Sequence, residues 1–211
     1  MNRNIAFLVI GLLNLTLTAE ADRPVDTFTA TLPSKKTTDS FKAPTPNHYV
    51  AFMSHTSLDT KATIGGSRSA AINIKKGSSI SGLLNIKSGT YIVTYAKGSG
   101  GWAFLSYSGH RGEKRKLGAN FNSADYESIG VTLKSAPPEG KLTITLHSAG
   151  KFKQHSLAIT GPHSYKFPLS AFEGVDLSNI ESIGVELHVV DAKEELEFEF
   201  SSISVHSIRK S

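Results

Sequence analysis

The residues best suited to chemistry lie in and just after one short segment, 102–107 (WAFLSY). Trp102 is the only tryptophan of the chain, and Tyr107 ends the segment. His110 and Arg111 open the densest basic run, 110–116 (HRGEKRK). Amphipathic rings offer an apolar face and a polar edge to a ligand, and a guanidinium can grip a carboxylate or a sulfate with paired hydrogen bonds. Trp102, Tyr107, His110 and Arg111 are therefore the predicted ligand-binding residues.

Each of these residues also has a structural interpretation. Alternation along a strand places Trp102 on one face and Tyr107 on the other, so Trp102 is either a core residue or a platform for a ligand. The basic run is either a solvated loop or a grip for an anionic ligand. Arg68 follows Gly65 and Gly66, and we interpret it as structural, with its guanidinium tying neighbouring carbonyl groups together.

No other cluster predicts chemistry. The eight histidines are scattered without the spacing of metal ligands, so no metal site is predicted. Glu195, Glu197 and Glu199 alternate with apolar residues, which indicates the solvent-exposed face of a half-buried strand rather than a pair of catalytic carboxylates. The chain contains no Gly-x-Ser-x-Gly, P-loop or HExxH motif. We therefore predict no catalytic residue and favour a protein that is not an enzyme.

The N-terminus predicts export. Arg3 precedes an apolar run, 5–13, and Ala19-Glu20-Ala21 matches a signal-peptidase site, so residues 1–21 are predicted to be a removed signal peptide. The apolar run is too short to span a bilayer, which takes about 20 residues, and no second hydrophobic span follows. The chain has no cysteine, which excludes disulfides and thiolate metal sites. We expect a secreted or periplasmic bacterial protein with no membrane span after processing.

The remaining pattern is that of strands. Short apolar or alternating segments follow one another with Gly, Pro and Ser turns between them, and none has a helical period. This favours an all-β fold with two antiparallel sheets packed as a sandwich. Residues 22–47 read as an N-terminal extension that could supply an edge strand, and residues 48–211 as the sandwich domain. An ESIGVxL sequence occurs twice, at 127–133 and 181–187, which predicts two neighbouring strands or a duplicated hairpin.

Charge is modest and mixed. Lys and Arg number 23 against 18 Asp and Glu, which gives a formal net charge of +5. Such a balance favours anionic partners slightly. Because charged residues make up only 19% and are spread along the chain, nucleic-acid binding is not expected.

Four stretches resemble a known group. They are, in chain order, 25–28 (VDTF), 64–68 (IGGSR), 105–109 (LSYSG) and 167–180 (FPLSAFEGVDLSNI). Their order resembles that of secreted galactose-binding-like jelly-roll domains, related to carbohydrate-binding modules and to complex I intermediate-associated β-sandwiches. The resemblance implies a jelly-roll sandwich. Two family aspartates are replaced, by Ser108 and Ser202, so the structural calcium of many relatives is doubtful here, and no cofactor is predicted.

These observations leave three functions open. The leading one is non-catalytic binding of a polysaccharide or a cell-surface glycan. The alternative is a structural or protein-interaction domain of the bacterial envelope. A third, less favoured, is a polysaccharide lyase that would use Tyr107, His110 and Arg111. Ligand identity and oligomeric state are beyond the sequence.

Overall fold

The computed structural model describes most of the chain after residue 21. The described residues are 22–30, 32, 38–43, 49–55, 58–108, 117–122 and 124–208. They contain no α-helix and no helix long and apolar enough to cross a membrane. The strands are β1 (Arg23–Asp26), β2 (Thr38–Ala43), β3 (Tyr49–His55), β4 (Arg68–Lys76), β5 (Ile80–Asn85), β6 (Thr90–Tyr95), β7 (Gly100–Ser108), β8 (Tyr126–Ser135), β9 (Lys141–Ser148), β10 (Lys151–Ala158), β11 (Ser164–Pro168), β12 (Ser182–Val189) and β13 (Leu196–Ser207). Two 3-10 helices, η1 (Ile64–Gly66) and η2 (Leu169–Phe172), interrupt them.

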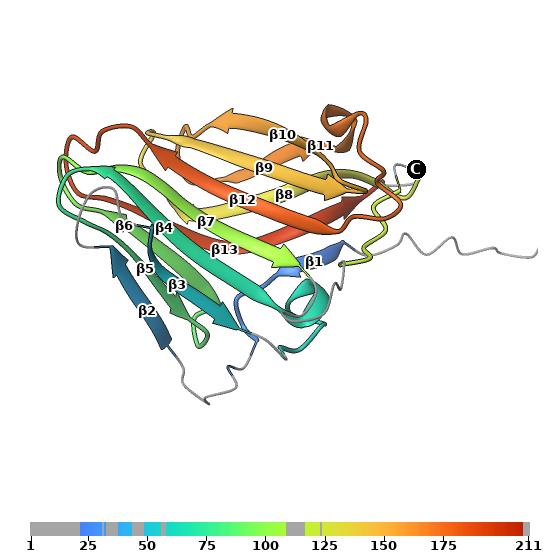
Figure 1. Cartoon of the computed structure of the whole chain (residues 1–211), viewed down its shortest axis with the longest axis horizontal. Coiled ribbons are helices and arrows are strands. Elements are labelled where there is room, and N and C mark those ends of the chain that lie inside the picture. The colour runs from blue at the N-terminus through green and yellow to red at the C-terminus, as the bar shows by residue number, and fades with distance from the viewer. Residues whose placement is uncertain are drawn as a thin grey trace, which may run out of the picture.

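The strands form two antiparallel sheets that pack face to face (Figure 1). The seven-stranded sheet has the order β11-β8-β13-β6-β5-β2, with β1 added to β13. The six-stranded sheet has the order β10-β9-β12-β7-β4-β3. The chain is therefore an all-β sandwich of jelly-roll type, as the sequence predicts.

The core follows from alternation along the strands. Leu196, Phe198 and Phe200 are buried, while Glu197 between them is exposed. On β7, residues 103, 105 and 107 are buried and residues 102, 104 and 106 point outward. Burial of one Leu or Phe side chain contributes roughly 1.5–3 kcal/mol, so these inward rows hold the sheets together. Both predicted alternations are confirmed.

The repeated ESIGVxL sequence corrects one prediction. Its first copy lies in β8 of the seven-stranded sheet and its second in β12 of the six-stranded sheet, so the copies are not neighbouring strands. Ile129 and Val131 of β8 are buried, as are Ile183 and Val185 of β12. The same short sequence therefore supplies buried Ile and Val side chains to the core from both sheets.

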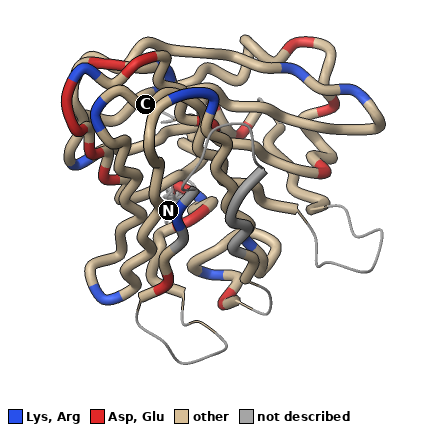
Figure 2. Tube along the Cα trace, turned by 60° about the vertical axis from the view of Figure 1, so that its left-hand side comes forward, with Lys and Arg blue, Asp and Glu red and all other residues tan. Residues whose placement is uncertain are grey.

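The N-terminal segment belongs to the sandwich. β1 pairs with the C-terminal half of β13, and β2 pairs with β5 at the edge of the seven-stranded sheet. Gly82 of β5 lies in continuous register with both neighbouring strands. Figure 2 shows Lys and Arg interspersed with Asp and Glu over the described trace.

Candidate functional site

The outward face of the six-stranded sheet carries the strongest group of binding side chains. Because the strands are in register, outward residues line up in rows across the sheet. One row runs Lys141, His188, Trp102 and Asn73 over β9, β12, β7 and β4. The next row runs Thr143, Glu186, Phe104 and Ala71. We call this surface, made of those eight residues and Lys75, the outer face.

Trp102 lies at the centre of the first row and is half-buried. Its indole stacks on the His188 imidazole, with 4.8 Å between ring centroids and 11° between ring planes. Lys75 covers the other side of the indole, with Nζ 5.1 Å from the ring centroid. Cation–π contacts of this kind contribute about 0.5–1 kcal/mol at exposed sites. The Trp102 side chain thus contacts His188 and Lys75 on the outer face and is not a core residue.

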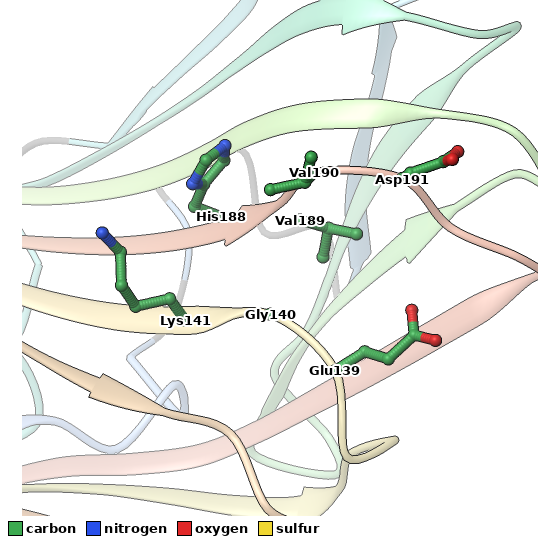
Figure 3. Close-up of a pocket in the computed structure, with 7 residues that line it drawn as sticks. All are labelled: Glu139, Gly140, Lys141, His188, Val189, Val190 and Asp191. Atoms are coloured by element: carbon green, nitrogen blue, oxygen red, sulfur yellow. The ribbon is translucent and has the colours of Figure 1, made fainter.

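A pocket of about 460 Å³ continues the first row beyond the end of β12. Figure 3 shows His188 and Lys141 on one side of it and Glu139 and Asp191 on the other. Val190 lines it as well and is 73% exposed. The pocket therefore combines an apolar contact with acceptor oxygens and donor nitrogens, which is the mixture that a polar, ring-shaped ligand needs.

Charges around the pocket are partly neutralised. Asp191 accepts from Lys76 Nζ at 2.9 Å and from Lys193 Nζ at 2.7 Å. These hydrogen bonds, that from Lys193 first, lower the pKa of Asp191 to about 2. Burial, aided by the positive charge of Lys141, lowers the pKa of His188 and so favours the neutral form of the imidazole that stacks on Trp102.

Glu186 differs from Asp191 in having no ionic partner among the described residues. Burial raises the pKa of its carboxyl group, while Lys141 opposes that shift. Glu186 is half-buried on the outer face, and its carboxyl group can accept hydrogen bonds from a ligand that lies on this face.

Tyr107 does not lie on the surface with Trp102, as the predicted site requires. Tyr107 is fully buried, and its hydroxyl donates to Asp26 Oδ2 at 3.0 Å. Its ring therefore offers no surface to a ligand, and the lyase interpretation loses its tyrosine. His110 and Arg111 lie outside the described residues, so their placement stays a prediction.

A buried polar cluster holds Tyr107 in place. Arg68 Nη1 donates to Asp26 Oδ2 at 2.5 Å, and both side chains are almost fully buried. Asp26 Oδ1 accepts from the Phe28 N–H at 2.8 Å and from the Thr63 hydroxyl at 3.3 Å. Arg68 is structural, as expected, but its partner is a carboxylate rather than the predicted carbonyls.

Three of the four stretches behind the family resemblance converge on this cluster. Asp26 comes from the VDTF stretch, Arg68 from the IGGSR stretch and Tyr107 from the LSYSG stretch. Gly65 and Gly66 have φ values of +67° and +64°, which glycine adopts without strain, and they form the turn that delivers Arg68. The resemblance therefore identifies the residues that lock the sandwich, not those that meet a ligand.

Trp102 is the one residue of the outer face that the sequence predicts. His188, Lys75 and Lys141 come from β12, β4 and the start of β9, so no local motif joins them to Trp102. Strand alternation could place each on an outward face, but only sheet order makes them neighbours. Trp102 stays a predicted binding residue, and its neighbours are His188 and Lys75 rather than the residues predicted with it.

Comparison with known proteins finds similarity of fold only. No family model and no curated protein matches the chain. A family 11 carbohydrate-binding module of a cellulosomal cellulase of Clostridium thermocellum is 15% identical, with a TM-score of 0.40 over 89% of this chain and 95% of that one. The family 11 module from the same organism, solved in complex with a β-1,3-1,4-mixed-linked tetrasaccharide, is 15% identical, with a TM-score of 0.37 over 79% of this chain and 95% of that one. A family 28 module specific for non-crystalline cellulose is 12% identical, with a TM-score of 0.32 over 65% and 82%.

All three of these structures are carbohydrate-binding modules. At such identities the likeness concerns the fold, and the roles of residues in this chain rest on its own geometry.

Proposed function

We propose that the protein is an exported, non-catalytic carbohydrate-binding module that holds a polysaccharide or a cell-surface glycan on the outer face. The observation that carries the proposal is the Trp102–His188 stack, which stands on an open sheet face beside a pocket with polar walls. Sugars combine apolar ring faces with polar rims, and such a surface suits both.

The arrangement suggests how a sugar is held. His188 occupies one side of the indole, so a pyranose ring would approach from the side of Lys75. Lys75 is exposed and has a flexible stem, so it can swing away and donate to the sugar's oxygens. Glu186 on the next row and Glu139 in the pocket supply acceptors for hydroxyl groups. Stacking then fixes the ring, and the polar groups fix its orientation.

The charges set the expected range of ligands. Lys75 and Lys141 flank the row, while Glu186 and Glu139 lie close by. A face with both signs can accept neutral glycans, and its two lysines can also pair with the carboxylate of an acidic glycan. Both kinds therefore belong in the screen.

The test uses the chain from residue 22 onward on a glycan array and in titrations with soluble polysaccharides. Because Trp102 is the sole tryptophan, its fluorescence reports directly on the site. A mixed-linked β-glucan, a galactan and a polyuronate make a first set of probes. We expect saturable binding to at least one of them with a change in Trp102 emission.

Absence of binding across neutral and acidic glycans, with unchanged emission, would overturn the proposal and favour the protein-interaction alternative. Binding without an emission change would place the ligand away from the outer face. Export is tested separately, by expressing the full chain in a bacterium and determining the N-terminal residue of the protein outside the inner membrane. We expect that residue to be Asp22.

A further inference from the structure

Strand β10 is the outermost strand of the six-stranded sheet, as Figure 1 shows. We propose that this edge is where two copies of the chain join. The two β10 strands would pair antiparallel about a two-fold axis and merge two six-stranded sheets into one of twelve. The proposal does not depend on carbohydrate binding.

The β10 edge lacks most of the devices by which sheets avoid such pairing. Proteins blunt edges with proline, short strands, bulges or charge. β11, at the same side of the other sheet, has five residues and ends at Pro168. β3, at the far edge of the six-stranded sheet, has an irregular register between Val50 and Phe52. β10 instead runs for eight residues in unbroken register with β9 and contains no proline.

The side chains of β10 are exposed in a way that a partner would relieve. Six of its eight residues are exposed, more than in any other strand whose burial is described. Phe152 is 62% exposed, and its ring rests on His147 with centroids 5.5 Å apart. No other described strand pairs with the outer edge of β10, so a second copy placed there could cover part of the Phe152 ring.

The sequence of β10 suits a second copy in one particular register. A two-fold axis at Gln154 sets Phe152 opposite Ser156 and Lys153 opposite His155 of the other copy. Gln154 then faces its own copy, and the two amides can hydrogen-bond to each other. No lysine faces a lysine in this register, whereas an axis at Lys153 would oppose two ammonium groups directly.

The charges of the edge predict its behaviour. Lys151 and Lys153 bring positive charge to both sides of the joint, and β10 carries no carboxylate. Salt screens repulsion between exposed charges, so the dimer should strengthen as ionic strength rises. A strand edge buries less surface than a standard interface, so we expect a reversible dimer. Because the strands continue one sheet, the two outer faces would lie on one surface, and a long polymer could engage both with gained avidity.

Sedimentation velocity of the chain from residue 22 onward, over a range of protein concentrations and at low and high salt, tests the proposal. We expect a monomer–dimer equilibrium with more dimer at high salt. Gln154→Lys would set two ammonium groups face to face on the axis, and we expect at least a tenfold weaker dimer. Leu83→Lys is the matched control, because Leu83 is 36% exposed on the other sheet and should leave the dimer unchanged.

Hydrogen exchange gives a second measurement that does not need a variant. Amides of β10 should become protected as the protein concentration rises, while those of β11 should not. A monomer at every concentration, or a dimer that Gln154→Lys leaves intact, would overturn the proposal. An association that weakens with salt would also overturn it, since it would mean that the basic edge meets an acidic surface instead.

Discussion

The buried cluster around Asp26, Arg68 and Tyr107 and the outer face around Trp102 both place a cation over an aromatic ring, but the two regions have different roles. In the buried cluster, Arg68 lies 5.5 Å from the Phe28 ring and its charge is met by Asp26 at 2.5 Å. On the outer face, Lys75 lies 5.1 Å from the Trp102 ring, and no carboxylate among the described residues pairs with it. Each site thus has a cation over an aromatic ring, but only the first is closed by a carboxylate inside the protein.

This difference separates structure from binding. A buried charge that is paired internally is out of reach of a ligand outside the protein, and its loss damages the fold. A half-exposed cation and ring keep their hydrogen-bonding and stacking capacity for a molecule outside. Proximity of an arginine, a tyrosine and an aspartate is therefore no sign of a binding site until burial is known.

The largest expected effect follows from removing Arg68. Arg68→Met leaves the Asp26 carboxylate buried without its cation, and breaking a buried pair costs about 3–5 kcal/mol of unfolding free energy. Urea denaturation measures the loss. Lys75→Met, the matched change on the outer face, removes only an exposed cation–π contact and should cost no more than about 1 kcal/mol. Equal losses in the two variants would erase the distinction between the two regions.

Trp102 provides the next largest effect, on binding rather than stability. Trp102→Ala removes the stacking ring, and we expect the affinity for the best glycan of the screen to fall at least about tenfold. Tyr107→Phe is the control, because it deletes only the hydroxyl that donates to Asp26. That variant should lose about 1 kcal/mol of stability and keep its glycan affinity. Calorimetric titration measures the glycan affinity of both variants, and urea denaturation measures the stability of Tyr107→Phe. A loss of glycan affinity in Tyr107→Phe would contradict the assignment of Trp102 to the site.

Two histidines predict a pH dependence of stability. Burial lowers the pKa of His55, although its hydrogen bond to Asp39 at 3.0 Å opposes this, and burial also lowers the pKa of His188. Below an unfolded value of about 6.5 the unfolded chain binds protons that the folded chain does not. Stability should therefore be complete above that pH and decline as pH falls through the lowered folded values.

Imidazole NMR titration locates both folded pKa values, and unfolding measured from pH 8 to pH 5 gives the energetic effect. His55→Gln should reduce the loss of unfolding free energy between pH 8 and pH 5. His188→Gln should reduce it by a smaller amount, because His188 is the more exposed of the two. A folded pKa above 6.5 for either residue would reverse the sign for that residue.

The smallest effect concerns two glutamates on different sheets. Glu186 lies on the outer face beside Phe104, whereas Glu197 is an exposed residue of β13. Glu186→Gln keeps the shape but changes an acceptor, so we expect a few-fold change in glycan affinity. Glu197→Gln should change neither affinity nor stability. Binding isotherms for the pair test this, and an equal response from both would remove Glu186 from the site.

Much of the architecture could be predicted, because alternation is a local property. Leu196, Phe198 and Phe200 are inward in the structure for the reason that the sequence suggested, and Trp102 and Tyr107 lie on opposite faces of β7 as alternation predicts. The pairing of strands could not be predicted in the same way. The two ESIGVxL segments look like neighbours, yet they lie in opposite sheets, because identical local patterns satisfy either wall of a core.

The candidate site could be predicted only in part. Trp102 could be singled out because it is unique and because its strand alternates. The degree of burial of Trp102 could not be predicted. The two faces of a strand look alike in the sequence, and only the packing of the opposite sheet decides which face is buried. For that reason Tyr107, which the sequence predicts at a ligand site, lies in the core instead. No local signal joins His188 to Trp102, because the two residues are 86 positions apart in the chain.

By itself the sequence determined the all-β sandwich, the alternation of each strand and the set of polar residues that could do chemistry. Those properties depend on residues that are close along the chain, so local physics specifies them. Only the tertiary structure decided that Asp26, Arg68 and Tyr107 close on one another inside, while Trp102, His188 and Lys75 meet outside. That choice depends on sheet order and register, which arise from contacts between distant segments and from the packing of one sheet over the other.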